Sequence, residues 1–348
     1  MTQPTDASFA CHLMLLRLAG RVPDEMLTRC RYDLAAGRLA ELAAEVAEEA
    51  YYADLPMPPD DIALLGELLS AAGHDVRVLD EIDLVEDEPR TPYWFTAEPP
   101  EEVAEPAVDL AGRMGWVAIS VASQQSGVRS LWRAWRIPLD ADAAFARPVF
   151  LVEADAGENL PATTAALQAA LTTAGDTHPQ VEVVPVGGEA AAYQRVALGY
   201  AALQWARTPS APLRLARLFD EVDPGTGPRF ADDHPRIADP RETARILDYL
   251  AGGQALLLTT SRMPDVVLAQ PAATVPLNFR TDGSFIWSDA SAYYLQRHGF
   301  APDPELLAHI RDGDYRPPPV DLATIQRAIS FLQQPLDEEP AWTFDVTV

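Results

Sequence analysis

Apolar residues recur every three to four positions through the first seventy residues of the chain, which is the period of an amphipathic helix. Phe9 and Leu13 mark the first such segment. Pro23-Asp24-Glu25 is typical of a helix start, with proline at the first helical position and acids in the first turn. We expect helices throughout residues 8–73, packed as a helical bundle that occupies residues 1–79.

The next segment, residues 80–112, is acidic and rich in proline. Between Asp80 and Asp109 it holds eleven acids and a single base, Arg90. One interpretation is a solvated linker, and the other is an acidic docking surface for a partner rich in arginine or lysine. An aromatic run in its middle favours contact, since a purely solvating linker has no use for such side chains. The candidate partner-binding residues are Tyr93, Trp94, Phe95, Glu101, Glu102 and Glu105.

Residues 113–208 predict an α/β unit, because short apolar runs alternate there with longer periodic segments. The expected elements are strands at 116–121, 128–137, 148–152 and 181–184 and helices at 160–174 and 189–207. The first two strands would form a hairpin. The strand–helix–strand order that follows indicates parallel pairing through a right-handed crossover.

The last unit, residues 209–348, is organised around a predicted hairpin at residues 275–287. Apolar residues alternate on both sides of Asp282-Gly283, which supplies the turn. Ser288 is then a good N-cap for a helix from about residue 289 to 298. The predicted structural core of this unit consists of Phe279, Asp282, Gly283, Phe285, Trp287 and Ser288.

The rest of this unit gives shorter signals. We expect strands at 213–218, 256–259 and 266–268, a long loop at 223–240, helices at 241–251, 304–312 and 321–333, and a final strand around Trp342 and Phe344. The fold class is therefore α+β, or mixed α/β, with an N-terminal helical bundle followed by mixed-sheet units with flanking helices.

Charge narrows the classes of partner. The chain of 348 residues has 52 acids against 26 bases, a formal net charge of −26, and every base is an arginine. Because this charge opposes binding to phosphate backbones, we expect no direct contact with nucleic acid and a basic protein as the partner. Arg129, Arg133 and Arg136 interleave with Trp132 and Trp135. In so acidic a chain these arginines are interpreted as paired with local carboxylates.

The missing lysine also limits the chemistry. Without lysine there is no Schiff base and no Walker lysine, which excludes pyridoxal-phosphate chemistry and conventional P-loop hydrolysis. The histidine spacings fit no helical zinc site, so we predict no metal and no cofactor. Gly187-Gly188 before a helix is a weak phosphate-binding signal, because Glu189 follows at the helix start.

Two sets of residues are candidates for catalysis. Asp282, Asp289 and His298 could form a cluster, but turn and helix-cap chemistry account for both aspartates. The other set lies in the long loop of the last unit and comprises Arg229, Asp232, Asp233 and His234.

The compartment follows from the cysteines and from apolar segments. Cys11 and Cys30 both lie in apolar helical patterns, and a disulfide between them is the less favoured alternative to two core thiols. The first residues lack the basic region of a signal peptide, and no apolar run approaches the length of a membrane span. We therefore expect a cytoplasmic protein that does not contact membranes.

The segment FRTDGSFIWSDASAYYLQRHGFAPDPELLAHI resembles a recurring C-terminal segment of uncharacterised actinobacterial proteins, and RVPDEMLTRCRYDLAAGRLAEL resembles their N-terminal helices. Such proteins are similar to those found beside polymorphic toxins, where acidic partners act as immunity or accessory proteins. The resemblance implies binding and supplies no catalytic residue. Our hypothesis is a non-enzymatic interaction protein. The alternative is an enzyme with a cleft between the two C-terminal units.

Overall fold

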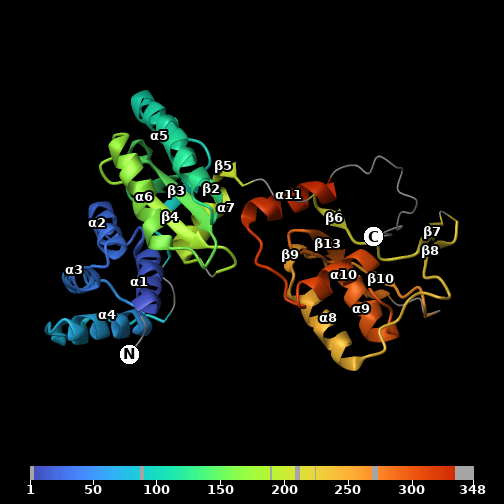
Figure 1. Cartoon of the computed structure of the whole chain (residues 1–348). Helices are drawn as coiled ribbons and strands as arrows, with labels where there is room; N and C mark the ends of the chain where they lie inside the picture. The colour runs from blue at the N-terminus through green and yellow to red at the C-terminus, as the bar shows by residue number, and fades with distance from the viewer. Residues whose placement is uncertain are drawn as a thin grey trace. The chain divides into compact units, whose positions relative to one another are not determined.

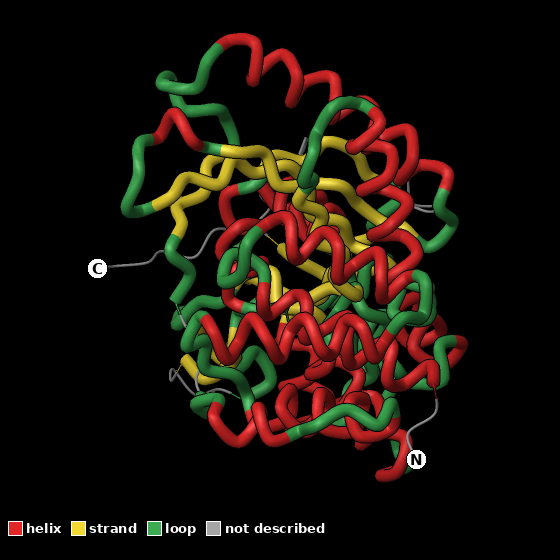
Figure 2. Tube along the Cα trace, turned by 90° about the vertical axis from the view of Figure 1, so that its left-hand side faces the viewer, coloured by secondary structure: helices red, strands yellow, loops and turns green. Residues whose placement is uncertain are grey.

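The computed structural model describes residues 4–86, 90–188, 190–207, 212–223, 225–268 and 273–333. The chain divides into two compact units, residues 1–207 and 208–348. Both units combine helices with strands, and four helices precede the first strand of the chain. Figure 2 shows the helices, strands and loops. The predicted α+β class is therefore confirmed. The helices of residues 8–73 and the strands of residues 113–207 belong to the same unit.

The first unit begins with four helices, as the hydrophobic period predicts. They are α1 (Pro4–Leu18), α2 (Asp24–Ala35), α3 (Leu39–Tyr52) and α4 (Pro59–Ala71). Asp24 and Glu25 occupy the first turn of α2, where negative charge complements the helix dipole. Gly37 follows the end of α2 with a φ of 75°, a left-handed conformation that favours glycine.

A five-stranded sheet forms the centre of the first unit (Figure 1). Its strands are β1 (Tyr93–Thr96), β2 (Val128–Pro138), β3 (Arg147–Ala154), β4 (Gln180–Pro185) and β5 (Ala202–Ala206). The order is β1-β2-β3-β4. Strands β1 and β5 lie on the same edge of β2, where β1 pairs with residues 135–138 and β5 with residues 130–133. Helix α6 (Leu160–Thr173) connects β3 to β4, and these two strands pair in parallel as predicted.

Two helices cover one face of this sheet. Helix α5 (Glu105–Gln124) and α6 pack together over apolar side chains of β2, β3 and β4, forming one buried core cluster that includes Leu131, Phe150 and Val152 (Figure 1). A short helix, α7 (Ala192–Tyr200), contacts β1, β2 and β3. Strands of this sheet position Trp94 on β1 and Glu182 on β4.

Two predictions for this unit are wrong. Residues 116–121 are helical, within α5, because the buried side chains of that segment recur every three to four positions and Trp116 is exposed. A short apolar run does not distinguish a helix from a strand. The predicted helix over 189–207 ends at Tyr200, and β5 follows it, because β2 offers a free edge whose hydrogen bonds β5 completes.

The second unit contains a four-stranded sheet ordered β6-β13-β12-β9 and two short two-stranded ribbons, β10-β11 and β7-β8. The strands are β6 (Arg214–Leu215), β7 (Glu221–Asp223), β8 (Gly227–Arg229), β9 (Gln254–Leu257), β10 (Arg262–Pro264), β11 (Ala273–Pro276), β12 (Phe279–Thr281) and β13 (Phe285–Ser288). The helices are α8 (Pro240–Gly252), α9 (Asp289–His298), α10 (Pro304–Asp312) and α11 (Leu322–Gln333).

The predicted hairpin and helix around Asp282-Gly283 are present. Strands β12 and β13 pair antiparallel, and Gly283 at the turn has a φ of 88°. The Ser288 hydroxyl accepts a hydrogen bond from the Ala290 N–H at 3.2 Å, and Gly299 ends α9 with a φ of 72°. Phe285 and Trp287 are buried, whereas Phe279 is only half-buried.

Other strand predictions in the second unit need correction. Residues 266–268 form a turn, and the strand nearby is β10, which pairs with β11. The Asp265 side chain accepts the N–H of Val267, an interaction that favours a turn. The predicted loop over 223–240 contains β8 and part of β7. The predicted strand at Trp342 and Phe344 lies outside the described residues.

Candidate functional site

The acidic segment belongs to the first unit and does not connect two units. Its strand β1 pairs with β2, and its last residues begin α5. Between them, the loop is anchored by Val103, which is buried with Ala111, Trp135 and Ala146. Pairing with the buried strand β2 satisfies backbone hydrogen bonds of Tyr93–Thr96 in this segment.

The sheet separates the three aromatic residues of the run. Phe95 is buried and packs edge to face on Tyr193, with ring centroids 5.2 Å apart. Tyr93 is half-buried, and the Arg136 guanidinium lies 4.6 Å from the centre of its ring. Trp94 points to the other face and is 61% exposed. Because alternate strand residues face opposite sides, Phe95 serves the core, and Trp94 is the residue of the run most available to a partner.

Further apolar side chains are exposed at the same end of the sheet. Trp94 pairs with Ile137, which packs on the buried cluster of Val103 and Trp135. The Leu139 N–H donates to the Pro92 carbonyl at 3.0 Å, which extends the β1–β2 pairing. Phe145 directly precedes Ala146 of the same cluster. Trp94, Leu139 and Phe145, 61%, 53% and 68% exposed, are called the Trp94 surface below.

Acidic residues surround this surface. The exposed acids of the adjoining loops and of the first turn of α5 are Glu98, Glu101, Glu102, Glu105, Asp140 and Asp142. In the described parts of the chain, none of the six forms an ion pair. Exposed apolar side chains that are accompanied along the chain by carboxylates without an ion pair can form an interface for a cationic surface. Sequence reasoning missed Leu139 and Phe145, because nothing in the local pattern brings them beside Trp94.

The opposite face of the sheet contains a buried ion pair. Glu182 on β4 is fully buried, and both of its oxygens lie 2.7 Å from Nη2 of Arg31 on α2. The Gln194 amide on α7 donates to the same carboxylate at 2.8 Å and to the Leu16 carbonyl at 2.9 Å. Through Arg31, Gln194 and the Leu16 carbonyl, this group of contacts connects helices α2, α7 and α1 to strand β4. The sequence signal for this buried ion pair is Glu182 itself, a charged residue between the valines of strand β4.

His12 fastens α1 to the sheet edge. Its Nε2 lies 2.7 Å from the Val183 carbonyl of β4, the last strand in the sheet order, and the side chain is buried. Nε2 donates this hydrogen bond, because a carbonyl oxygen only accepts. Burial, opposed by the hydrogen bond to Val183 and assisted by the charge of Arg31, lowers the pKa of His12 to about 4. The imidazole is therefore neutral in the folded protein near neutral pH.

Acidification is expected to destabilise the fold through His12. Its pKa rises from about 4 in the folded chain to roughly 6.5 on unfolding, so the neutral side chain stabilises the fold fully above pH 6.5 and progressively less below it. Between pH 7 and pH 5 this contribution falls by about 2 kcal/mol. The measurement is urea unfolding of the wild type and of His12→Gln, which retains an N–H donor and does not titrate. Equal pH dependence in both proteins would contradict the assignment.

Two of the three arginines singled out on β2 are paired with carboxylates. Arg129 pairs with Asp155, directly after the neighbouring strand β3, at 2.7 Å, as the interpretation of local pairing predicts. Arg136 instead pairs with Asp24 of the distant helix α2 at 2.5 Å, and Arg133 has no ion pair among the described residues. Trp132 and Trp135 between them are buried, so neither offers a ring face for stacking.

The predicted catalytic cluster of the second unit does not assemble. Asp282 accepts hydrogen bonds from Tyr249 at 2.6 Å and lies 2.9 Å from Nε2 of His309. His298 instead pairs with Asp265 at 2.7 Å. Asp289 binds Arg280 and Asn278, each at 2.8 Å. Each of the three groups, all within the described ranges, thus has its own polar partner, and no contact joins the three.

The candidates in the long loop are also separated. Arg229 pairs with Glu221 on the neighbouring strand. His234 places Nδ1 2.8 Å from Asp220 and Nε2 3.0 Å from the Ala301 carbonyl, so both ring nitrogens are engaged. Asp232 and Asp233 are both exposed, and neither has an ion pair within the described ranges.

The described residues contain no group of three or more His, Cys, Asp or Glu side chains that could hold a metal ion. Cys11 and Cys30 are free and buried, and burial raises the pKa of Cys11 to about 11. Thiols this difficult to ionise are poor nucleophiles. Among the helices of the described ranges, none is both apolar and long enough to cross a bilayer.

The structure thus separates the predicted catalytic residues and leaves Trp94 exposed on β1. Comparison with protein families, with curated proteins and with solved structures gives no match to this chain.

Proposed function

We propose that this chain is a non-enzymatic binding protein that docks a basic protein through the Trp94 surface. The observation that carries the proposal is the 61% exposure of Trp94 on an ordered strand, next to unpaired acids. Exposed tryptophan is characteristic of binding hot spots, and it is rigidly held here because β1 pairs with β2.

The two kinds of residue would have different roles. The carboxylates Glu101, Glu102 and Glu105 attract a positively charged partner over distances of about a Debye length, roughly 8–10 Å at physiological salt. Trp94, Leu139 and Phe145 then supply the apolar contact that slows dissociation. A net charge of −26 supports a cationic partner and disfavours nucleic acid.

The proposal includes a location in the cytoplasm and a role of the immunity or accessory type. Two free, buried cysteines are consistent with a reducing compartment. A role of this type requires a surface for one protein partner and no catalytic group, and the Trp94 surface has that chemistry.

The test is photo-crosslinking in the native cell, with a benzophenone amino acid at position 94 and, as a control, at position 52. Tyr52 is 75% exposed on α3, away from the Trp94 surface. We expect position 94 to capture a basic protein that position 52 does not. Capture of an acidic protein, or the same products from both positions, would overturn the proposal.

The captured partner then allows a kinetic prediction. Replacing Glu101, Glu102 and Glu105 by glutamine should slow association several-fold and change dissociation by less than about twofold, because exposed charges act mainly on encounter. Trp94→Ala should instead speed dissociation. The matched control replaces three exposed acids of the helical bundle, Glu41, Glu48 and Asp60, by asparagine or glutamine. Surface plasmon resonance at two salt concentrations measures both rates, and insensitivity to salt would contradict the steering role.

A further inference from the structure

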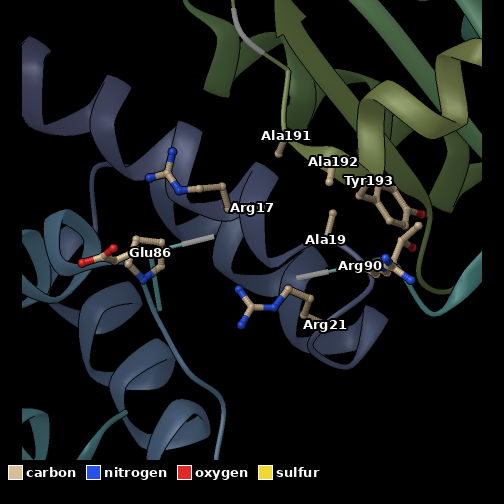
Figure 3. A pocket seen from close by; sticks show the side chains of 10 residues that line it. Arg17, Ala19, Arg21, Glu86, Arg90, Ala191, Ala192 and Tyr193 are labelled. Atoms are coloured by element: carbon tan, nitrogen blue, oxygen red, sulfur yellow. The ribbon is translucent and has the colours of Figure 1, made fainter. Parts of the chain in front are cut away.

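Two hollows in the first unit differ in size and in lining. The cavity in Figure 3 has a volume of about 40 Å³, and the guanidinium groups of Arg17, Arg21 and Arg90 around it do not converge on one point. The other hollow has a volume of about 380 Å³, which is the size of a pocket for a small molecule. We call it the tyrosine pocket, because Tyr51 and Tyr52 line it.

Helix α3 forms one side of the tyrosine pocket. Ala44, Ala47, Glu48, Tyr51 and Tyr52 are its lining residues from this helix. They recur at spacings of three and four, which places them on one face of α3. Because the two alanines are small, the face is hollow between the longer side chains of the glutamate and the tyrosines.

The end of α4 and the residues after it form the other side. Leu69 is buried near the end of α4, Val78 lies in the 3-10 helix η1 (Arg77–Glu81), and His74 and Asp75 complete the lining. Helix α3 contacts both α4 and η1, so the two sides are held against each other. The pocket thus has an apolar base and walls that come from three helices.

The two tyrosine rings are free on their faces for a cation. They stand edge to face, with centroids 5.2 Å apart and 68° between their planes, and Tyr51 and Tyr52 are 42% and 75% exposed. Arginines of this chain lie 3.7–4.6 Å from the ring centres of Tyr93, Phe285 and Tyr315. In the described ranges, no arginine lies over Tyr51 or Tyr52. Two such rings at a large angle form part of an aromatic cage.

The charges around the pocket also favour a cation. Residues 36–84 contain twelve acids and two bases, Arg38 and Arg77. Each base already pairs with an aspartate, at 2.5 and 2.6 Å respectively. Glu48 is exposed and has no ion pair within the part of the chain that the structure describes. Its carboxylate, three and four residues before the tyrosines, is therefore available as a counter-ion.

We propose that the tyrosine pocket binds a small quaternary or tertiary ammonium compound, with Tyr51 and Tyr52 as aromatic walls and Glu48 as the counter-ion. The negative face of an aromatic ring attracts a cation, and N-methyl groups also gain apolar contact with Ala47 and Leu69. A primary ammonium is more strongly hydrated and gains less from such walls. A neutral molecule of the same shape gains the apolar contact alone.

This site is independent of the Trp94 surface. Its ligand is a small molecule, whereas the Trp94 surface would take a protein. Its residues belong to α3, α4 and η1, whereas Trp94 lies on β1. Failure of either proposal therefore leaves the other standing.

The test is titration of the purified chain with choline, followed by isothermal calorimetry and by saturation-transfer NMR of the N-methyl protons at constant ionic strength. We expect saturable binding at millimolar choline or below. The comparison ligand is 3,3-dimethyl-1-butanol, which has the shape of choline and no charge. It should bind about tenfold more weakly or worse, because it loses the attraction of both rings and of the carboxylate.

Substitutions at exposed positions assign the binding to this pocket. Tyr52→Leu should weaken choline binding about two- to fivefold and Tyr52→Phe should not, because phenylalanine keeps the ring. Glu48→Gln should weaken it about two- to fivefold, and less at high salt. The matched controls are Tyr200→Leu, at a tyrosine that is 54% exposed on α7, and Asp60→Asn, at an exposed acid of α4.

Three results would overturn the inference. The first is the absence of saturable choline binding. The second is equal affinity for choline and for the neutral alcohol, which would show that no cation is recognised. The third is equal affinity in the wild type and in Tyr52→Leu, or the same loss in Tyr52→Leu and in Tyr200→Leu.

Discussion

Replacing Glu182 by glutamine is expected to lower the free energy of unfolding by about 3–5 kcal/mol. The carboxylate is fully buried and is the anion that Arg31 binds, and Arg31 itself is only 3% exposed. Glutamine has nearly the same shape but no charge, so the change leaves a guanidinium cation in the interior without its counterion. Urea unfolding followed by circular dichroism measures the loss.

The double variant Arg31→Met with Glu182→Gln tests whether the loss of stability comes from the uncompensated charge of Arg31 or from altered packing. We expect it to lose less stability than Glu182→Gln alone, because the uncompensated charge is gone. Arg77→Gln, at an exposed pair with Asp75 whose side chains are 86% and 58% exposed, should leave unfolding unchanged within error. A loss in Glu182→Gln no larger than in Arg77→Gln would show that Glu182 is not an anchor of the fold.

The elements that could be predicted from sequence are those whose signals are local. Ser288 before α9, Gly299 after it and the turn at Gly283 each act on the backbone within a few residues, and all three are where the pattern places them. Residues 116–121 show the opposite case. Their apolar run fits a strand as well as a helix, and α5 is decided by the burial of Met114 and Ala118 against the sheet.

The candidate site could be predicted less well than these local elements, because it depends on contacts between residues that are distant in sequence. The sequence indicated an acidic and aromatic segment, but Phe95 is buried because β1 joins the sheet and places it against Tyr193. Leu139 could not be assigned to the end of the sheet where Trp94 lies, since the pairing of β1 with the end of β2 brings it there. Phe145 reaches the same end of the sheet through its neighbour Ala146, which packs with Trp135. Likewise, all three histidine–aspartate pairs of the second unit join residues that are 14 to 33 positions apart.

Trp287→Ala is expected to destabilise the second unit by about 3–5 kcal/mol, the usual cost of truncating a buried aromatic residue. Trp287 has no exposed surface and packs with Tyr249, Leu250 and Leu295 in one core cluster. Its indole N–H also donates to the Leu250 carbonyl at 3.2 Å. The side chain therefore joins the hairpin of β12 and β13 to helix α8, and alanine leaves both a cavity and an unpaired carbonyl.

Trp116→Ala is the matched control, because it removes the same side chain from a position that is 75% exposed. We expect a change within about 0.5 kcal/mol there. Hydrogen exchange followed by mass spectrometry can assign the loss to the second unit, since peptides from α8 and α9 should lose protection in Trp287→Ala while peptides from β3 do not. Equal stability of the two variants, or lost protection confined to residues 1–207, would show that Trp287 does not hold this unit together.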